Sequence, residues 1–142
     1  MSENVHPQNF NDGVIEDFRA HDGKTTGPFA DAPLVLITAT GAKSGIDRTF
    51  PIVYTKDGDD LVIAASKQGA DTNPDWYHNI VANPEVTVEL PGETYQATAR
   101  AEAAGDERDR LFAAHSAAMP DFAKYQDQTK RVIPVVVISK KR

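Results

Sequence analysis

Short β-branched segments separated by tight turns are the feature of this sequence that most constrains its fold. The run Leu34–Thr40 is almost wholly apolar and rich in β-branched residues, which is typical of a strand buried on both faces. We expect two more strands over residues 48–55 and 60–65. The segment Lys56–Asp59 between them holds an Asp-Gly pair, which is a strong hairpin signal, so these two strands should pair antiparallel.

A second hairpin is expected later in the chain. Residues 86–90 alternate apolar with polar side chains, and the Pro-Gly-Glu turn at 91–93 leads into another alternating strand over 94–103. A last strand is expected over 132–138. Six strands, two hairpins and no regular strand–helix alternation predict an α+β, mainly β fold, an antiparallel barrel with peripheral helices.

Helices are expected around the strands. Residues 14–19 have the apolar spacing of a short amphipathic helix. A second helix should run to Asn83 from Asn73-Pro74, where an N-cap residue precedes a proline at the first helical position. A third is expected over 106–118, and residues 119–128 should form a loop or a broken helix.

The length of 142 residues fits one domain. We expect residues 1–13, which are polar and rich in Asn, Asp and Gln, to be a flexible arm, and residues 14–142 to be the domain. No apolar run approaches the roughly 20 residues of a membrane span, so we expect no membrane insertion. A cytoplasmic location is expected because the N-terminus has no secretory signal and the chain no cysteine.

Charge and residue types exclude several function classes. The net charge of −6 argues against a nucleic-acid partner, which would require a basic face. Without cysteine there is no thiolate metal site and no cysteine nucleophile. The four histidines are scattered in separate elements, so we expect no metal site. The motifs of serine hydrolases and zinc proteases are missing as well.

The turn from Thr40 to Arg48 is the first candidate binding site. It joins two strands and combines glycines with Lys43, Ser44 and Arg48. Exposed backbone N–H groups and fixed positive charge on such a turn can hold an anion. The sequence does not match a P-loop, and spacing alone favours a plain connector with exposed cations.

Three further segments could contact a ligand. Ala64–Lys67 closes a strand in small residues, which lets a flat ligand approach the backbone; it could equally be packed under a helix. Asn73–Asn79 places Trp76 and Tyr77 beside polar groups, although core packing suits such aromatics too. Phe122 and Tyr125 are three residues apart, so they share one face if this segment is helical. They could cover a pocket or be part of the scaffold.

Six segments, in this order, resemble the deazaflavin-dependent nitroreductase family of actinobacteria. The resemblance extends from about Leu34 to Ile138. Each segment is a weak signal alone, but six in register are specific. They are a T-x-T-G-x-K-S/T-G turn at 38–45, Arg48 followed by Pro51, Ala64–Lys67, an N-P-x-W-Y-x-N run at 73–79, Ala82-Asn83-Pro84 and Ile133–Val136.

This resemblance implies a split β-barrel of about six strands, like that of flavin reductases and FMN-binding proteins, which binds the hydroxy-deazaflavin coenzyme F-420. It implies that Lys43, Ser44 and Arg48 hold the anionic tail and phosphate of the cofactor. It also implies that Phe122 and Tyr125 face the substrate. The donor to the reduced acceptor could be Tyr125, Ser66 or a bound water, and we favour Tyr125. The other cofactor-binding residues it implies are Ala42, Pro51, Ile52, Val53, Ala64, Ala65, Ser66, Lys67, Trp76, Tyr77 and Asn79.

The activity that follows is hydride transfer from reduced coenzyme F-420 to an electron-poor acceptor: a nitroaromatic compound, an enone or unsaturated lactone, or a quinone. Two alternatives stay open, an FMN-dependent split-barrel oxidoreductase and a protein that carries deazaflavin without turnover. The first would bind only a short phosphate and would not require both Lys43 and Arg48. We also expect a homodimer that pairs through the apolar strand at 132–138.

Overall fold

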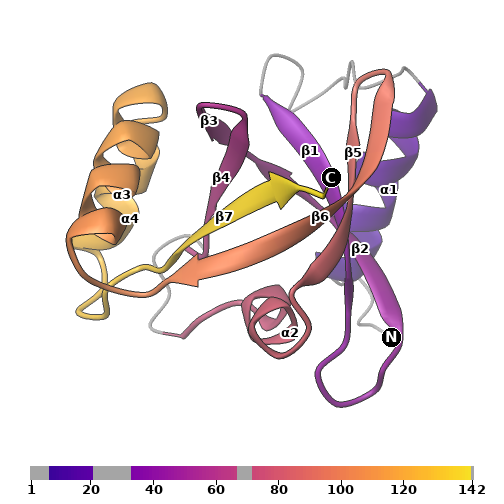
Figure 1. The fold of residues 1–142 in the computed structure, drawn as a ribbon, viewed down its shortest axis with the longest axis horizontal. Coiled ribbons are helices and arrows are strands. Elements are labelled where there is room, and N and C mark those ends of the chain that lie inside the picture. The colour runs from indigo at the N-terminus through magenta and orange to yellow at the C-terminus, as the bar shows by residue number, and fades with distance from the viewer. Residues whose placement is uncertain (1–6, 21–32, 67–71, 142) are drawn as a thin grey trace.

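A curled antiparallel sheet forms the centre of the molecule (Figure 1). The computed structural model describes residues 7–20, 33–66 and 72–141. The seven strands follow the order β2-β1-β5-β6-β7-β4-β3, and the neighbouring pairs are antiparallel. Along the chain they are β1 (Leu34–Thr40), β2 (Asp47–Val53), β3 (Thr55–Asp57), β4 (Asp60–Ala64), β5 (Glu85–Leu90), β6 (Glu93–Glu102) and β7 (Val135–Lys140).

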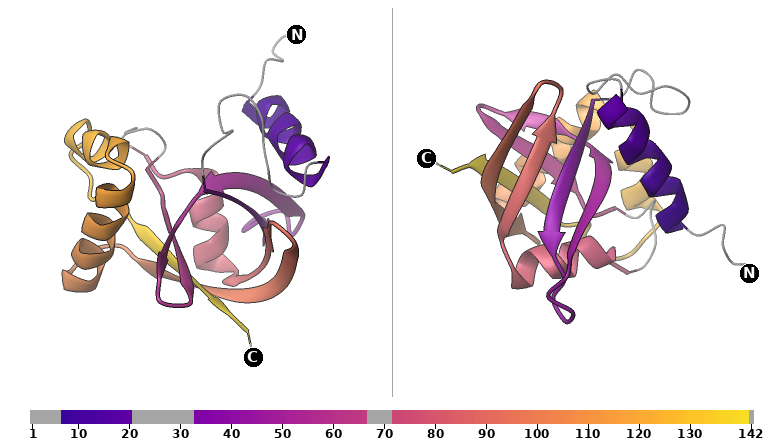
Figure 2. Two further views of the ribbon diagram at one scale, coloured as in Figure 1. Left: turned by 90° about the horizontal axis from the view of Figure 1, so that it is seen from above. Right: turned by 90° about the vertical axis from the view of Figure 1, so that its right-hand side faces the viewer.

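The sheet curls because its two edge strands are neighbours in the chain. Only Tyr54 separates β2 from β3, although these strands lie at opposite ends of the strand order. Consecutive Cα atoms are about 3.8 Å apart, so the two edges must come together. The backbone N–H of Tyr54 also donates to the carbonyl of Pro33 at 3.0 Å, just before β1. The predicted antiparallel barrel is therefore confirmed, as a split barrel (Figure 2).

The main core fills the inside of this curl. Strand alternation directs every second side chain inward. The helix α2 (Asp75–Ala82) contributes Tyr77 and Ile80 to the core, next to the ends of β1 and β6. The remaining buried members are Val35, Ile37, Ala39, Phe50, Leu61, Ile63, Ala65, Val86, Val88, Ala97, Ala99, Val136 and Ile138.

Three helices cover the outer face of the sheet on two opposite sides (Figures 1 and 2). The helix α1 (Pro7–Ala20) packs against Leu34 and Leu36 of β1. On the other side, α3 (Asp106–Ala118) and α4 (Asp121–Asp127) cover β4 and β7. Val53 packs against both groups. No helix in the described part of the chain is long and apolar enough to cross a membrane.

Several element boundaries differ from those predicted. The helix α1 begins at Pro7, so it includes Pro7–Gly13 of the segment expected to be an arm; residues 1–6 lie outside the described ranges. Proline suits the first turn of a helix. The polar residues after Pro7 lack the apolar spacing of an amphipathic helix, so the sequence pattern did not indicate this start. The strand expected over 48–55 is two strands, because the chain changes sheet edge at Tyr54. Within the 119–128 segment, a regular helix, α4, forms.

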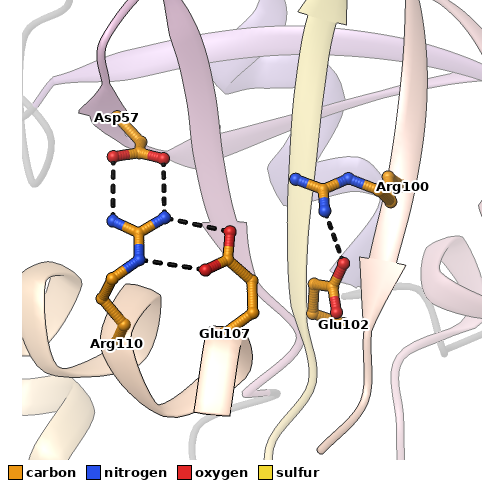
Figure 3. A network of polar contacts seen from close by, with 5 residues as sticks. All are labelled: Asp57, Arg100, Glu102, Glu107 and Arg110. Carbon is orange, nitrogen blue, oxygen red and sulfur yellow. Dashed lines mark hydrogen bonds and ion pairs between the residues drawn. The ribbon is translucent and has the colours of Figure 1, made fainter. Parts of the chain in front are cut away.

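An exposed network of charges ties α3 to the β3–β4 hairpin (Figure 3). The guanidinium of Arg110 donates to both carboxylate oxygens of Asp57, at 3.1 and 3.0 Å. It also donates to Glu107 one turn earlier on α3. These hydrogen bonds lower the pKa of both carboxyl groups. The network fixes α3 to the turn end of the β3–β4 hairpin, where Asp57 pairs with Asp60.

A fully buried histidine lies under the two helices. Nδ1 of His115, on α3, is hydrogen-bonded to the hydroxyl of Thr55 at 2.7 Å. The ring packs edge-on against Phe122, with centroids 4.5 Å apart, and Nε2 has no partner in the structure. Burial lowers the pKa of His115 to about 4. The native fold therefore holds a neutral imidazole.

This burial makes the free energy of unfolding depend on pH. In the unfolded chain His115 titrates near its ordinary pKa of about 6.5, so the unfolded state binds the proton more readily between about 6.5 and about 4. Stability should be full above this window and should fall by roughly 3 kcal/mol as the pH drops through it. Urea denaturation of the wild type and of His115→Leu, at pH values on both sides of the window, measures the effect. The variant should lose less stability on acidification; an equal loss in both proteins would contradict the assignment.

Candidate functional site

The β1–β2 turn is held by its own hydrogen bonds. Gly41 N–H donates to the carbonyl of Ile46, and Gly45 N–H to that of Gly41. Ile46 N–H donates to the hydroxyl of Ser44 at 3.1 Å. Gly45 has a φ of 71°, in the left-handed region that glycine adopts readily. The turn is thus a compact unit whose shape is set before any ligand arrives.

Two asparagines attach this turn to α2. Asn79 accepts the N–H of Ala42 through Oδ1, at 2.9 Å. Asn83, directly after α2, donates through Nδ2 to the carbonyl of Thr40 at 3.3 Å. The predicted residues Ala42 and Asn79 therefore do lie together. Because Asn79 Oδ1 already accepts from Ala42, the amide NH2 group of Asn79 is the part that could donate to a ligand.

Part of the backbone of the predicted anion site is already hydrogen-bonded. The N–H groups of Gly41, Ala42, Gly45 and Ile46 all donate within the protein, so these four are not available to an anion. Lys43, Ser44 and Arg48, in contrast, are exposed. Lys43 and Ser44 lie in the turn and Arg48 lies at the start of β2. Two cations and a hydroxyl fit a phosphate or carboxylate tail, because such anions bind strongly to charge-assisted donors.

The strand end at Ala64–Ser66 is buried, and its successive side chains face opposite sides of the sheet. Ala64 lies in the outer cluster beneath α3 and α4, whereas Ala65 belongs to the inner core. The Ala65 N–H donates to the carbonyl of Pro134, and the Ala65 and Ser66 carbonyls accept from Arg131. Lys67, expected to follow them in the site, lies outside the described residues. The side chains of Ala64, Ala65 and Ser66 are small, and all three are covered by other residues in this structure.

The outer cluster brings together residues predicted from separate parts of the chain. Val53 of β2 and Ala64 of β4 share it with Phe122 and Tyr125 of α4. The Phe122 and Tyr125 rings meet edge-on, with centroids 5.5 Å apart. Phe122 is buried, and Tyr125 is half-buried. Expected ring-side and acceptor-side residues are therefore neighbours on one face.

Other predicted residues face the inside of the curl. Ile52 and Trp76 pack against the inner core, and Tyr77 is a buried member of it. Trp76 stacks on Phe50 with ring centroids 5.1 Å apart and planes 15° apart. Burial raises the pKa of Tyr77. Pro51 pairs with Leu36, whose side chain is on the outer face, so strand alternation places Pro51 outward with Val53.

Sequence reasoning missed a group of polar residues behind this site. Arg131 lies between α4 and β7 and donates to the strand end through its guanidinium. Gln126 and the buried Arg108 continue the hydrogen bonds toward α3. None of the three stands at a recognisable periodicity or turn, and their partners include the backbone carbonyls of Ala65, Ser66, Arg131 and Ile133. Only the fold brings them together.

Two surface hollows lie elsewhere. One of about 250 Å³ lies between α1 and the β5–β6 hairpin, near Arg19 and Glu89. The other, of about 760 Å³, lies at the end of the sheet away from α2, near Lys56, Leu90 and Tyr95. Neither is lined by a predicted site residue. We give more weight to the cluster than to the hollows, because the cluster contains residues predicted to contact the cofactor and the acceptor.

The curled sheet with helices on its outer face defines the class of protein: a split β-barrel. The chain belongs to the F420H(2)-dependent quinone reductase family, whose sequence model matches residues 13–140. The family consists of oxidoreductases, and reduced coenzyme F-420 is its cofactor. The predicted enzyme class and cofactor are thus confirmed, and the FMN alternative is not needed.

Individual relatives agree with this assignment. The chain is 36% identical to an F420H(2)-dependent quinone reductase of Mycobacterium tuberculosis over 111 residues, 77% of this chain and 74% of that protein. A solved F420-H2-dependent reductase is 38% identical, with a TM-score of 0.69 over 75% of this chain and 94% of the other. A second solved structure, described as a domain-swapped dimer, is 36% identical, with a TM-score of 0.71 over 90% of this chain and 98% of the other.

The close approach at Gly41 yields a prediction about the turn. A Cβ atom at this position would lie 2.5 Å from Ser44 Oγ and 3.3 Å from the carbonyl oxygen of Ile46. Gly41→Ala should therefore lower the free energy of unfolding by about 1–3 kcal/mol through overpacking. Ser44→Ala should cost about 1 kcal/mol, because it removes the acceptor of the Ile46 N–H. Denaturant unfolding gives both values.

The double variant supplies the control. Without Ser44 Oγ, the nearest remaining side-chain atom is Ser44 Cβ at 3.7 Å, an ordinary contact. Gly41→Ala/Ser44→Ala should thus cost less than the two single changes added together. Strict additivity would show that the Oγ contact does not set the shape of the turn.

Proposed function

We propose that this protein transfers a hydride from reduced coenzyme F-420 to an electron-poor organic acceptor, with quinones as the favoured class. The observation that carries the proposal is the outer cluster, in which Val53 and Ala64 adjoin Phe122 and Tyr125. The family supports the quinone, since its description names quinone reduction. A nitroaromatic compound or an enone is polarised in the same way and belongs to the same panel of acceptors.

Binding of the cofactor would use both parts of the site. Lys43 and Arg48 would pair with its anionic tail, helped by the Ser44 hydroxyl, which can still donate. Pro51, Val53 and Ala64 would contact the ring from the outer face of the sheet. When bound, the reduced deazaflavin supplies the hydride and the two electrons of the reduction. The protein has to place the acceptor beside it.

Tyr125 is the residue of this chain best placed to assist the acceptor. Negative charge develops on the acceptor as the hydride arrives, and a hydrogen-bond donor there lowers the barrier. The Tyr125 ring is held by Phe122 at one edge, which limits where its hydroxyl can point. Phe122 and the aliphatic members of the cluster exclude water from the same place. Ser66, at the strand end, is the second candidate donor.

Two variants separate cofactor binding from turnover. Arg48→Ala removes a cation from an exposed turn, so cofactor affinity should fall by about 1–3 kcal/mol, and less at high salt, with kcat at saturation nearly unchanged. Tyr125→Phe should keep cofactor affinity and lower kcat by an amount that differs among acceptors. Titration followed by Trp76 fluorescence gives the affinity, and mixing with reduced cofactor and each acceptor gives the rates.

The wild type in the same assay tests the function itself. It should oxidise the reduced cofactor only when an acceptor is present, with a quinone among the best. Tight binding without turnover on quinone, nitro and enone acceptors would contradict the proposal. Loss of cofactor binding in Tyr125→Phe, with full binding in Arg48→Ala, would reverse the assigned roles.

We also propose that the chain forms a homodimer, as suggested by the 36% identical relative described as a domain-swapped dimer. The interface predicted from residues 132–138 is wrong: β7 lies between β4 and β6, and Val135–Ile138 are buried. An unpaired edge of the sheet, such as β2, is the better candidate. Light scattering at tens of micromolar protein should give twice the chain mass; a mass near 15.5 kDa would contradict the proposal.

A further inference from the structure

Arg131 joins three elements around the candidate site. Its Nη2 donates to the carbonyls of Ala65 and Ser66, at 3.1 and 2.9 Å. Its Nη1 donates to Oδ1 of Asn73, just before α2, at 2.7 Å. One guanidinium thus holds the end of β4 and the approach to α2, which are seven residues apart in the chain. A planar group with several fixed donors is needed for three acceptors in different directions.

Gln126 connects the same residue to the acceptor-side helix. Its Nε2 donates to the carbonyl of Arg131 at 2.7 Å. Its Oε1 accepts from the N–H of Ile133 at 2.9 Å and from Arg108 Nη2 at 2.6 Å. A backbone carbonyl on one side and a backbone N–H on the other fix the orientation of this amide. Gln126 follows Tyr125 directly on α4, so the network anchors the helix that carries the expected donor.

We propose that Arg131 is a positioning residue of the reductase, which sets the spacing between the strand end under the cofactor ring and the helix that carries Tyr125. This inference rests on the proposed function. Arg131 would contact neither the cofactor ring nor the acceptor. It acts through the Ala65 and Ser66 carbonyls and, by way of Gln126, through α4. Hydride transfer depends steeply on the distance between the reacting atoms, so a small displacement of either side slows it.

The first test compares two arginines that each make several hydrogen bonds. Arg131→Lys keeps the charge but cannot reach all three acceptors, so kcat at saturating cofactor should fall about ten-fold or more. Arg110→Lys is the matched control, because Arg110 makes a comparable set of bonds to Asp57 and Glu107 away from the site (Figure 3). It should lower thermal stability and leave kcat and KM within about two-fold of the wild type. Both are assayed well below their melting temperatures.

A second variant cuts only the link to α4. Gln126→Glu keeps acceptors for Arg108 and the Ile133 N–H but replaces the donor to the Arg131 carbonyl with a carboxylate oxygen. It should lower kcat while cofactor affinity, measured by Trp76 fluorescence, stays near that of the wild type. Arg131→Lys should reduce both, because it also loosens the strand end.

The outcomes separate this inference from the function on which it rests. Two results would overturn the positioning role: wild-type kinetics in both Arg131→Lys and Gln126→Glu, or an equal loss of kcat in Arg110→Lys. In either case, turnover by the wild type would still uphold the function. If the wild type reduced no acceptor, the function would fail. The cofactor titration would then still test the inference: unchanged affinity in Arg131→Lys would overturn it, and weakened affinity would uphold the role of Arg131 at the strand end.

Discussion

The single residue between β2 and β3 is the constraint on which the rest of the structure depends. Tyr54 joins the two edges of the sheet, so the sheet has to curl, and its inner face becomes a closed core. The curl also brings the outer faces of β2 and β4 next to each other, with Val53 in contact with the helices on both sides. The candidate site lies on this outer face, so it exists only because the chain crosses from one edge to the other.

The site combines two supports of different physical kind. The β1–β2 turn is rigid through backbone hydrogen bonds and asparagine braces, and it presents exposed cations. The strand end and α4 are held instead by arginine and glutamine side chains that bind backbone carbonyls. These charged and amide donors brace the strand end and α4 from behind the apolar cluster.

Much of the fold could be predicted from local sequence signals, and the failures have physical causes. The Asp-Gly turn and the alternating strands gave correct hairpins because those signals act over a few residues. The division of residues 48–55 at Tyr54 was missed because an edge crossing depends on which distant strands pair. Motif matching placed Val53, Ala64 and Tyr125 in one site, and they are neighbours. Motif matching could not separate these residues from the inward-facing Ile52 and Ala65, because packing in the core decides which face of the sheet each side chain points to.

Amide hydrogen exchange with and without reduced coenzyme F-420 tests the central claim most directly, because it locates the bound cofactor on the whole chain. We expect slower exchange at residues 42–53 and 62–66 and in α4 when the cofactor binds. Protection confined to the hollow near Lys56, Leu90 and Tyr95, with no change at the β1–β2 turn or the end of β4, would contradict it.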